Sequence, residues 1–188
     1  MSVRWLRANA AAYGADPDHI GIWGGSAGAH LAALAGVTGD LPELEGTSGS
    51  PGYSSRVQAV ALASGPSDFL HAGGGEMDTE ADGPVTWLFG GTKKERADLM
   101  RLGSPLSHIT SDAPPFLIAH GTLDETVPFQ QAEFLYAALT AVNVEVELIP
   151  LDGFYHNWTT QVENIPERED TWKLGPMALP FFQKHLRP

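Results

Sequence analysis

Apolar positions follow two different spacings along the chain, and together they predict alternating strands and helices. Short, mostly apolar runs are typical of buried strands, and four occur here, at residues 19–23, 57–63, 116–119 and 144–149. Apolar residues at helical spacing, or strong helix formers, occupy residues 3–13, 29–36, 94–102, 128–142 and 176–186. Such alternation predicts an α/β fold with a mostly parallel sheet and flanking helices.

Two longer stretches fall outside this pattern. Residues 36–55 are rich in Gly, Ser and Pro and are expected to form a long surface loop. Residues 65–103 are mixed: they contain three consecutive glycines at 73–75, an acidic stretch and the helix expected near its end. With 188 residues and no internal repeat, the whole chain is expected to form one domain.

Composition removes several classes of function. The chain has 23 acidic and 11 basic residues, a net charge of −12, which argues against a nucleic-acid or anionic-membrane surface. It has no cysteine, which excludes disulfides, thiolate nucleophiles and Cys-based zinc sites. No apolar run reaches the roughly 18 residues of a membrane span, and residues 1–7 lack the apolar core of a signal peptide. These features do not decide between a cytoplasmic and a secreted protein.

The sharpest motif is Gly24-x-Ser26-x-Gly28, placed where the first strand runs into the first long helix. A turn this tight exposes the Ser26 hydroxyl at the carboxyl end of the sheet and points the helix N-terminus at it. We therefore interpret Ser26 as a nucleophile, the Ala27 N–H as an oxyanion donor and Gly25 as part of the substrate site. The alternative is a phosphate-binding loop, which lacks the P-loop lysine and the full dinucleotide fingerprint.

A serine nucleophile needs a base and an acid, which follow it in that fold in the order acid, then His. His156 lies just after the fourth strand and is the favoured base. The acid is expected in the loop after the third strand, where Asp124 is favoured and Glu125 is the alternative. His120 is expected to brace this loop. No pair of histidines has ligand spacing beside an acidic residue, so neither a metal nor another cofactor is predicted.

These motifs together resemble the α/β-hydrolase esterase and lipase family. The matching segments are residues 20–36, 54–69, 104–128 and the Gly153-x-x-His156 loop. The branch that the chain resembles most contains bacterial acetyl esterases and bifunctional feruloyl/acetyl-xylan esterases. The resemblance implies the same triad of Ser26, Asp124 and His156. It also implies that residues from about 70 to 103 are an insertion near the site mouth.

The sequence departs from that family at two places. The family's oxyanion loop and first strands precede its nucleophile, whereas here only residues 1–25 do, so the sheet is expected to lack those strands. The strand from Ile20 to Trp23 would then be an edge without blunting charges. It could be completed by a second chain or by a second copy in a homodimer, or the reading frame could be truncated. The glycines at 73–75 after His71 resemble the missing loop but lie downstream, and we expect an ordinary loop there.

The second departure concerns aromatic residues around the base. Phe154 and Tyr155 replace small residues of the family, and Trp158 follows two positions after His156. They could form a wall that stacks on a sugar or an aromatic acyl group, or simply pack. The predicted function is a serine carboxyl-ester hydrolase for short acyl esters, such as acetylated or feruloylated plant carbohydrate. The alternatives are a non-catalytic binding or assembly module and a peptidase of the same fold.

Overall fold

The computed structural model describes residues 2–71, 77–80, 82–157 and 175–187. Every predicted strand and helix is present, with ends shifted by a few residues. The elements in chain order are α1 (Ser2–Asn9), η1 (Ala10–Tyr13), β1 (Gly21–Gly25), α2 (Ala27–Val37), α3 (Pro42–Glu45), β2 (Ala59–Ala63), α4 (Pro84–Phe89), α5 (Lys93–Gly103), η3 (Pro105–His108), β3 (Phe116–Gly121), α6 (Gln130–Ala141), β4 (Val146–Leu151) and α7 (Gly175–His185).

Two short α-helices were not predicted, and neither was the 3-10 helix η3. Helix α3 lies inside the expected loop at 36–55, and α4 lies in the mixed region before α5. Both are too short to show a helical period. Each has Pro in its first turn, where the missing N–H costs nothing.

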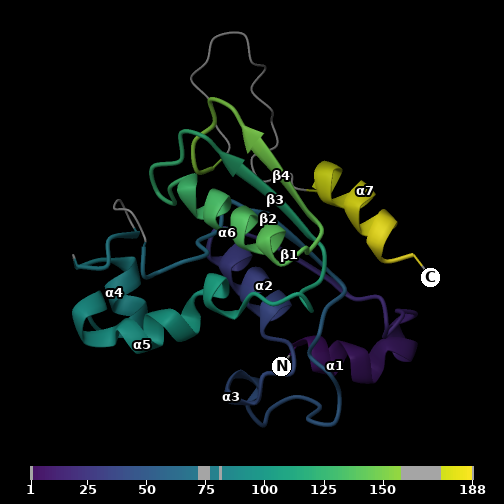
Figure 1. Cartoon of the computed structure of the whole chain (residues 1–188). Helices are drawn as coiled ribbons and strands as arrows, with labels where there is room; N and C mark the ends of the chain where they lie inside the picture. Colours follow the sequence, from purple (N-terminus) through teal and green to yellow (C-terminus); the bar gives the residue numbers. More distant parts are fainter. Residues whose placement is uncertain (1, 72–76, 81, 158–174, 188) are drawn as a thin grey trace.

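The four strands form one parallel sheet in the order β1-β2-β3-β4, which confirms the predicted fold class. Strands that follow one another along the chain therefore lie side by side in the sheet, as Figure 1 shows. The register aligns the strand ends: Gly25 pairs with Ala63, Ala63 with Ala119, and Ala119 with Ile149. Because all four strands run the same way, the loops that follow them meet along one edge of the sheet.

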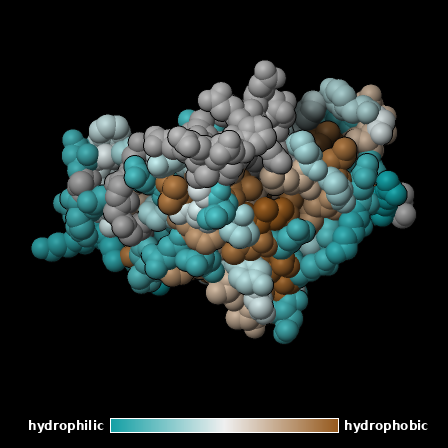
Figure 2. Space-filling model, turned by 90° about the horizontal axis from the view of Figure 1, so that it is seen from above, coloured by the Kyte–Doolittle hydropathy of each residue, from teal (hydrophilic) through white to brown (hydrophobic). Residues whose placement is uncertain are grey.

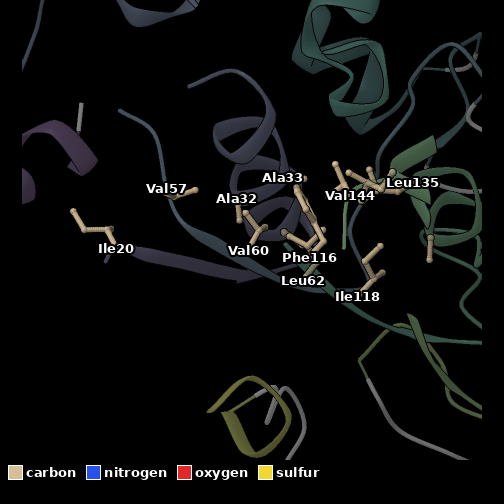
Figure 3. Packing of buried hydrophobic residues seen from close by; sticks show 13 residues of the cluster. Ile20, Ala32, Ala33, Val57, Val60, Leu62, Phe116, Ile118, Leu135 and Val144 are labelled. Carbon is tan, nitrogen blue, oxygen red and sulfur yellow. The ribbon is translucent and has the colours of Figure 1, made fainter. Parts of the chain in front are cut away.

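Helices cover both faces of this sheet, with a separate apolar cluster on each. On one face, Val60, Leu62, Phe116 and Ile118 share a cluster with residues of α2 and α6, and Figure 3 shows Val60 and Phe116 next to alanines of α2. On the other face, three alanines of β2 share a cluster with Ala178 and Phe181 of α7. Successive side chains of a strand point to opposite faces, so β2 contributes to both clusters. None of the described helices is long and apolar enough to cross a membrane.

Strand β1 lies at one edge of the sheet that the described residues form. Its one strand partner there is β2. The Trp23 side chain in the middle of β1 is 58% exposed. The apolar strand that the sequence predicts is therefore uncovered along one side.

The junction between β1 and α2 is the tightest part of the fold. Ser26 separates the two elements and adopts φ 53° and ψ −123°, a strained conformation for a residue with a side chain. A Cβ at Gly24 would lie 2.3 Å from the Gly28 carbonyl oxygen. The glycine at 24 thus lets strand and helix backbones touch, whereas Gly28 has open space around the position of a Cβ.

This difference predicts opposite effects of one substitution at two glycines. Gly24→Ala should lower the free energy of unfolding by roughly 3 kcal/mol, because the new methyl group meets backbone that cannot move aside. Gly28→Ala lies in a helix and should change it by no more than about 1 kcal/mol, in the stabilising direction. Urea unfolding of the two variants measures both values, and equal losses would contradict this account of the junction.

Candidate active site

The junction presents the Ser26 hydroxyl at the carboxyl end of the sheet. The Ser26 N–H donates to the Ala63 carbonyl at 2.8 Å, which fixes the residue against the end of β2. Its own carbonyl accepts the His30 N–H at 3.1 Å, at the start of α2. The side chain is left free to point away from both elements. Its Oγ lies 2.9 Å from Nε2 of His156, which comes from the loop after β4.

His156 links this hydroxyl to a carboxylate. Its Nδ1 lies 2.7 Å from Oδ2 of Asp124, in the loop after β3. A carboxylate oxygen can only accept, so Nδ1 carries the proton and Nε2 accepts the Ser26 O–H. The sequence favoured Asp124 as the acid, with Glu125 as the alternative. The structure brings Asp124 to His156, while Glu125 is exposed to solvent.

The Asp124 carboxylate is fully buried and has four donors around it. Oδ1 accepts the Thr126 N–H at 3.0 Å and the Val127 N–H at 2.8 Å. Oδ2 faces both His156 and Nε2 of His120, the latter at 3.2 Å. Burial alone would raise the pKa of Asp124, but the hydrogen bonds of His120, His156 and Val127 lower it well below its ordinary 3.8. The group is thus held ionised.

The two loops that carry the acid and the base are joined by their backbones. The Thr122 N–H donates to the Leu151 carbonyl at 3.0 Å, and the Leu123 N–H donates to the Phe154 carbonyl at 2.9 Å. A Cβ at Gly121 would lie 2.4 Å from that same Phe154 oxygen, so the close approach requires glycine. This contact fixes the distance between Asp124 and His156.

The predicted oxyanion donor, the Ala27 N–H, lies at the start of α2. Ala27 is the first residue of that helix, and the first N–H groups of a helix have no partner within it. The helix dipole adds positive potential at the same end. Among the described residues, no group of three His, Cys, Asp or Glu side chains is arranged to hold a metal ion.

The remaining predicted site residues differ in their surroundings. Gly25 ends β1 next to Ser26, and Tyr155 is half-buried next to His156. Phe154 packs against the apolar cluster under α7, so the structure gives its side chain a packing role. Trp158 and the glycines at 73–75 lie outside the described residues.

The sequence anticipated that His120 braces the acid loop, but it did not show that His120 meets the Asp124 carboxylate itself. The ring reaches both this carboxylate and the Val127 carbonyl, the latter at 2.8 Å. The spacing of four residues between His120 and Asp124 was the only available signal, and it is common by chance.

Comparisons with known proteins lead to esterases. Residues 1–139 match the BD-FAE protein family. Esterase LipQ of Mycobacterium tuberculosis is 40% identical over 143 residues, which cover 73% of this chain and 32% of LipQ. A truncated carbohydrate esterase from gut microbiota superposes with a TM-score of 0.82 at 30% identity, covering 98% of this chain and 65% of that structure.

A thermophilic esterase of Thermogutta terrifontis superposes with a TM-score of 0.73 at 28% identity. All of this chain and 63% of that esterase are covered. The fold is therefore that of the α/β-hydrolase esterases, as the resemblance implied. The chain spans about one third of LipQ and somewhat under two thirds of the two solved structures.

The lowered pKa of Asp124 predicts how stability depends on pH. Because the pKa is lower in the folded chain, ionised Asp124 stabilises the fold above about pH 4, and this contribution is lost as pH falls further. In Asp124→Asn, the free energy of unfolding should therefore fall less steeply than in the wild type between about pH 5 and pH 2. Urea unfolding across that range measures the slope. Asp98→Asn, which alters an exposed carboxyl on α5, should keep the wild-type slope, and an equal slope in Asp124→Asn would contradict the assignment.

Proposed function

Because the chain belongs to the BD-FAE family, we propose that it is a serine carboxyl-ester hydrolase with Ser26 as nucleophile, His156 as base and Asp124 as acid. One observation carries the proposal. An unbroken chain of contacts runs from Ser26 Oγ to His156 Nε2 at 2.9 Å and from His156 Nδ1 to Asp124 Oδ2 at 2.7 Å. Three separate loops supply these groups, an arrangement that packing of the fold does not require.

The proposed reaction follows from the positions of the protons. His156 Nε2 takes the Ser26 proton as Oγ attacks the ester carbonyl, and Asp124 stabilises the imidazolium that forms. The Ala27 N–H donates to the oxyanion of the tetrahedral intermediate. The intermediate collapses as His156 returns its proton to the departing alcohol, leaving an acyl group on Ser26. Water then attacks this acyl group with His156 again as base, which releases the acid and restores Ser26.

The proposed substrates are short acyl esters, among them acetylated or feruloylated plant carbohydrate. A carbohydrate esterase is among the similar structures, which supports a sugar as the alcohol. Tyr155, half-buried beside His156, could contribute an aromatic contact. Figure 2 looks onto the molecule from above, toward the end where β3 and β4 finish, and shows hydrophobic residues gathered between hydrophilic ones. The net charge of −12 disfavours anionic substrates.

We further propose that the whole chain is one domain, with residues from about 70 to 103 inserted beside the mouth of this site. In support, the inserted helices are fastened to α2, the helix that begins at the nucleophile. His30 Nε2 of α2 donates to the Gly103 carbonyl at 2.7 Å. The His30 ring also meets Phe69 edge-on at 5.0 Å, and Phe69 meets Phe89 of α4 in the same way. The insertion is thus held near the start of α2.

Ester hydrolysis by the purified chain tests the proposal. Ser26→Ala should reduce the rate on p-nitrophenyl acetate by at least about 10³-fold, because the variant can form no acyl intermediate. Ser107→Ala alters an exposed serine on η3 and should keep the wild-type rate. Equal rates for Ser26→Ala and the wild type would instead favour a binding or assembly module. Cleavage of an amide substrate while acetate esters survive would favour a peptidase.

For the 188-residue chain on its own, we also propose a homodimer through β1. Residues 20–25 contain no charge or proline that would blunt an edge strand, and Trp23 is exposed. Two copies that pair β1 with β1 across a twofold axis would form one continuous sheet and cover the β1 edge of each copy.

Light scattering should then give about twice the 20.1 kDa mass of one chain. Trp23→Lys should restore the monomer, because it places a charge on the pairing edge. Trp87→Lys alters an exposed tryptophan of α4 and should leave the dimer intact. A wild-type chain that scatters as a monomer would contradict the proposal.

A further inference from the structure

We propose that His120 is a positioning residue that shares the Asp124 carboxylate with His156 and thereby sets how strongly His156 holds a proton. The inference rests on the proposed function, because it concerns the base of the same triad. It adds a second imidazole to the site, one that touches neither Ser26 nor any atom that reacts.

The geometry places the two imidazoles on one oxygen. Asp124 Oδ2 lies 2.7 Å from His156 Nδ1 and 3.2 Å from His120 Nε2. The side chains of His120 and Asp124 are both fully buried, so water does not screen the contact. The Val127 carbonyl lies 2.8 Å from the same His120 nitrogen. Both of these neighbours are acceptors, so Nε2 of His120 carries a proton that it shares between them.

The other nitrogen of His120 favours the neutral ring. Its Nδ1 is buried and has no hydrogen-bond partner among the described residues. Protonation there would bury an N–H with no acceptor, which is costly. Phe129 meets the ring edge-on at 5.8 Å and holds it in place. His120 is thus a fixed neutral donor, not a second counter-charge.

The negative charge of Asp124 is therefore shared between two imidazoles, those of His120 and His156. Within the described part of the chain, the titratable groups that face the carboxylate are His120 from β3 and His156 from the loop after β4. Glu125 and Asp152 on the same loops are exposed. A second donor on Oδ2 withdraws negative charge from the bond to His156. Without it, the carboxylate would stabilise protonated His156 more strongly, and His156 would act as a base only at higher pH.

Three variants separate this role from mere packing. His120→Phe removes the donor but keeps a ring of similar size, whereas His120→Gln retains an N–H donor at the end of the side chain. His30→Phe is the matched control, since His30 is another buried histidine, and its ring meets the Gly103 carbonyl and Phe69. The His30 backbone N–H, which donates to the Ser26 carbonyl, is kept in that variant. Two quantities are measured for each: the pH profile of kcat/KM on p-nitrophenyl acetate, and the titration of the His156 ring by NMR of ¹⁵N-histidine-labelled chain without substrate.

In His120→Phe, the acid limb of the profile and the His156 titration midpoint should both move to higher pH by about half a unit. The value of kcat/KM at its optimum should fall about tenfold, a part of what general-base catalysis contributes. His120→Gln should return both pH values toward the wild type. His30→Phe should leave both in place, although it too loses a buried hydrogen bond.

An unmoved midpoint in His120→Phe, or one that moves to lower pH, would overturn the proposal, as would a shift that His30→Phe reproduces. The NMR titration needs no turnover. If the chain hydrolyses no ester, the proposed function fails, while the coupling between His120, Asp124 and His156 is still decided by the midpoint.

Discussion

The turn at Ser26 is the constraint on which the rest of the site depends. Strand β1 must end and α2 must begin within one residue, and this is achieved by a strained backbone at Ser26 and by contact between Gly24 and Gly28. The hydrogen bond from the Ser26 N–H to the Ala63 carbonyl ties that turn to the sheet register. Any slip of β1 against β2 would move the nucleophile along the edge and out of reach of His156. The 2.9 Å contact between them is therefore a property of the whole sheet.

Electrostatics adds a second requirement. A buried carboxylate is costly unless donors surround it, and Asp124 meets this demand with two backbone N–H groups and two imidazoles. The same donors that keep it ionised also hold it in one orientation, with Oδ2 toward His156. Stability and chemistry are thus coupled at this residue, because the donors that offset the cost of burying the charge also orient the carboxylate.

Much of this arrangement could be predicted from the sequence, because local signals were strong where the site lies. Apolar runs located all four strands, and chain order then placed Ser26, the acid loop and His156 on one edge. The sequence favoured Asp124 over Glu125 but could not exclude Glu125, since the position of the acid depends on a turn in which Asp124 accepts the N–H groups of its own loop. The packing of Phe154 under α7 and the meeting of His120 with Asp124 depend on contacts between distant elements, which no local pattern encodes.

The central claim is that Ser26 becomes covalently acylated with His156 as its base. Labelling with a fluorophosphonate, followed by peptide mass spectrometry, tests it most directly because the reagent traps an activated serine without requiring turnover. The account predicts one adduct, on the peptide that contains Ser26, and its loss in His156→Ala. An adduct on a different serine, or an unlabelled chain that remains folded, would contradict it.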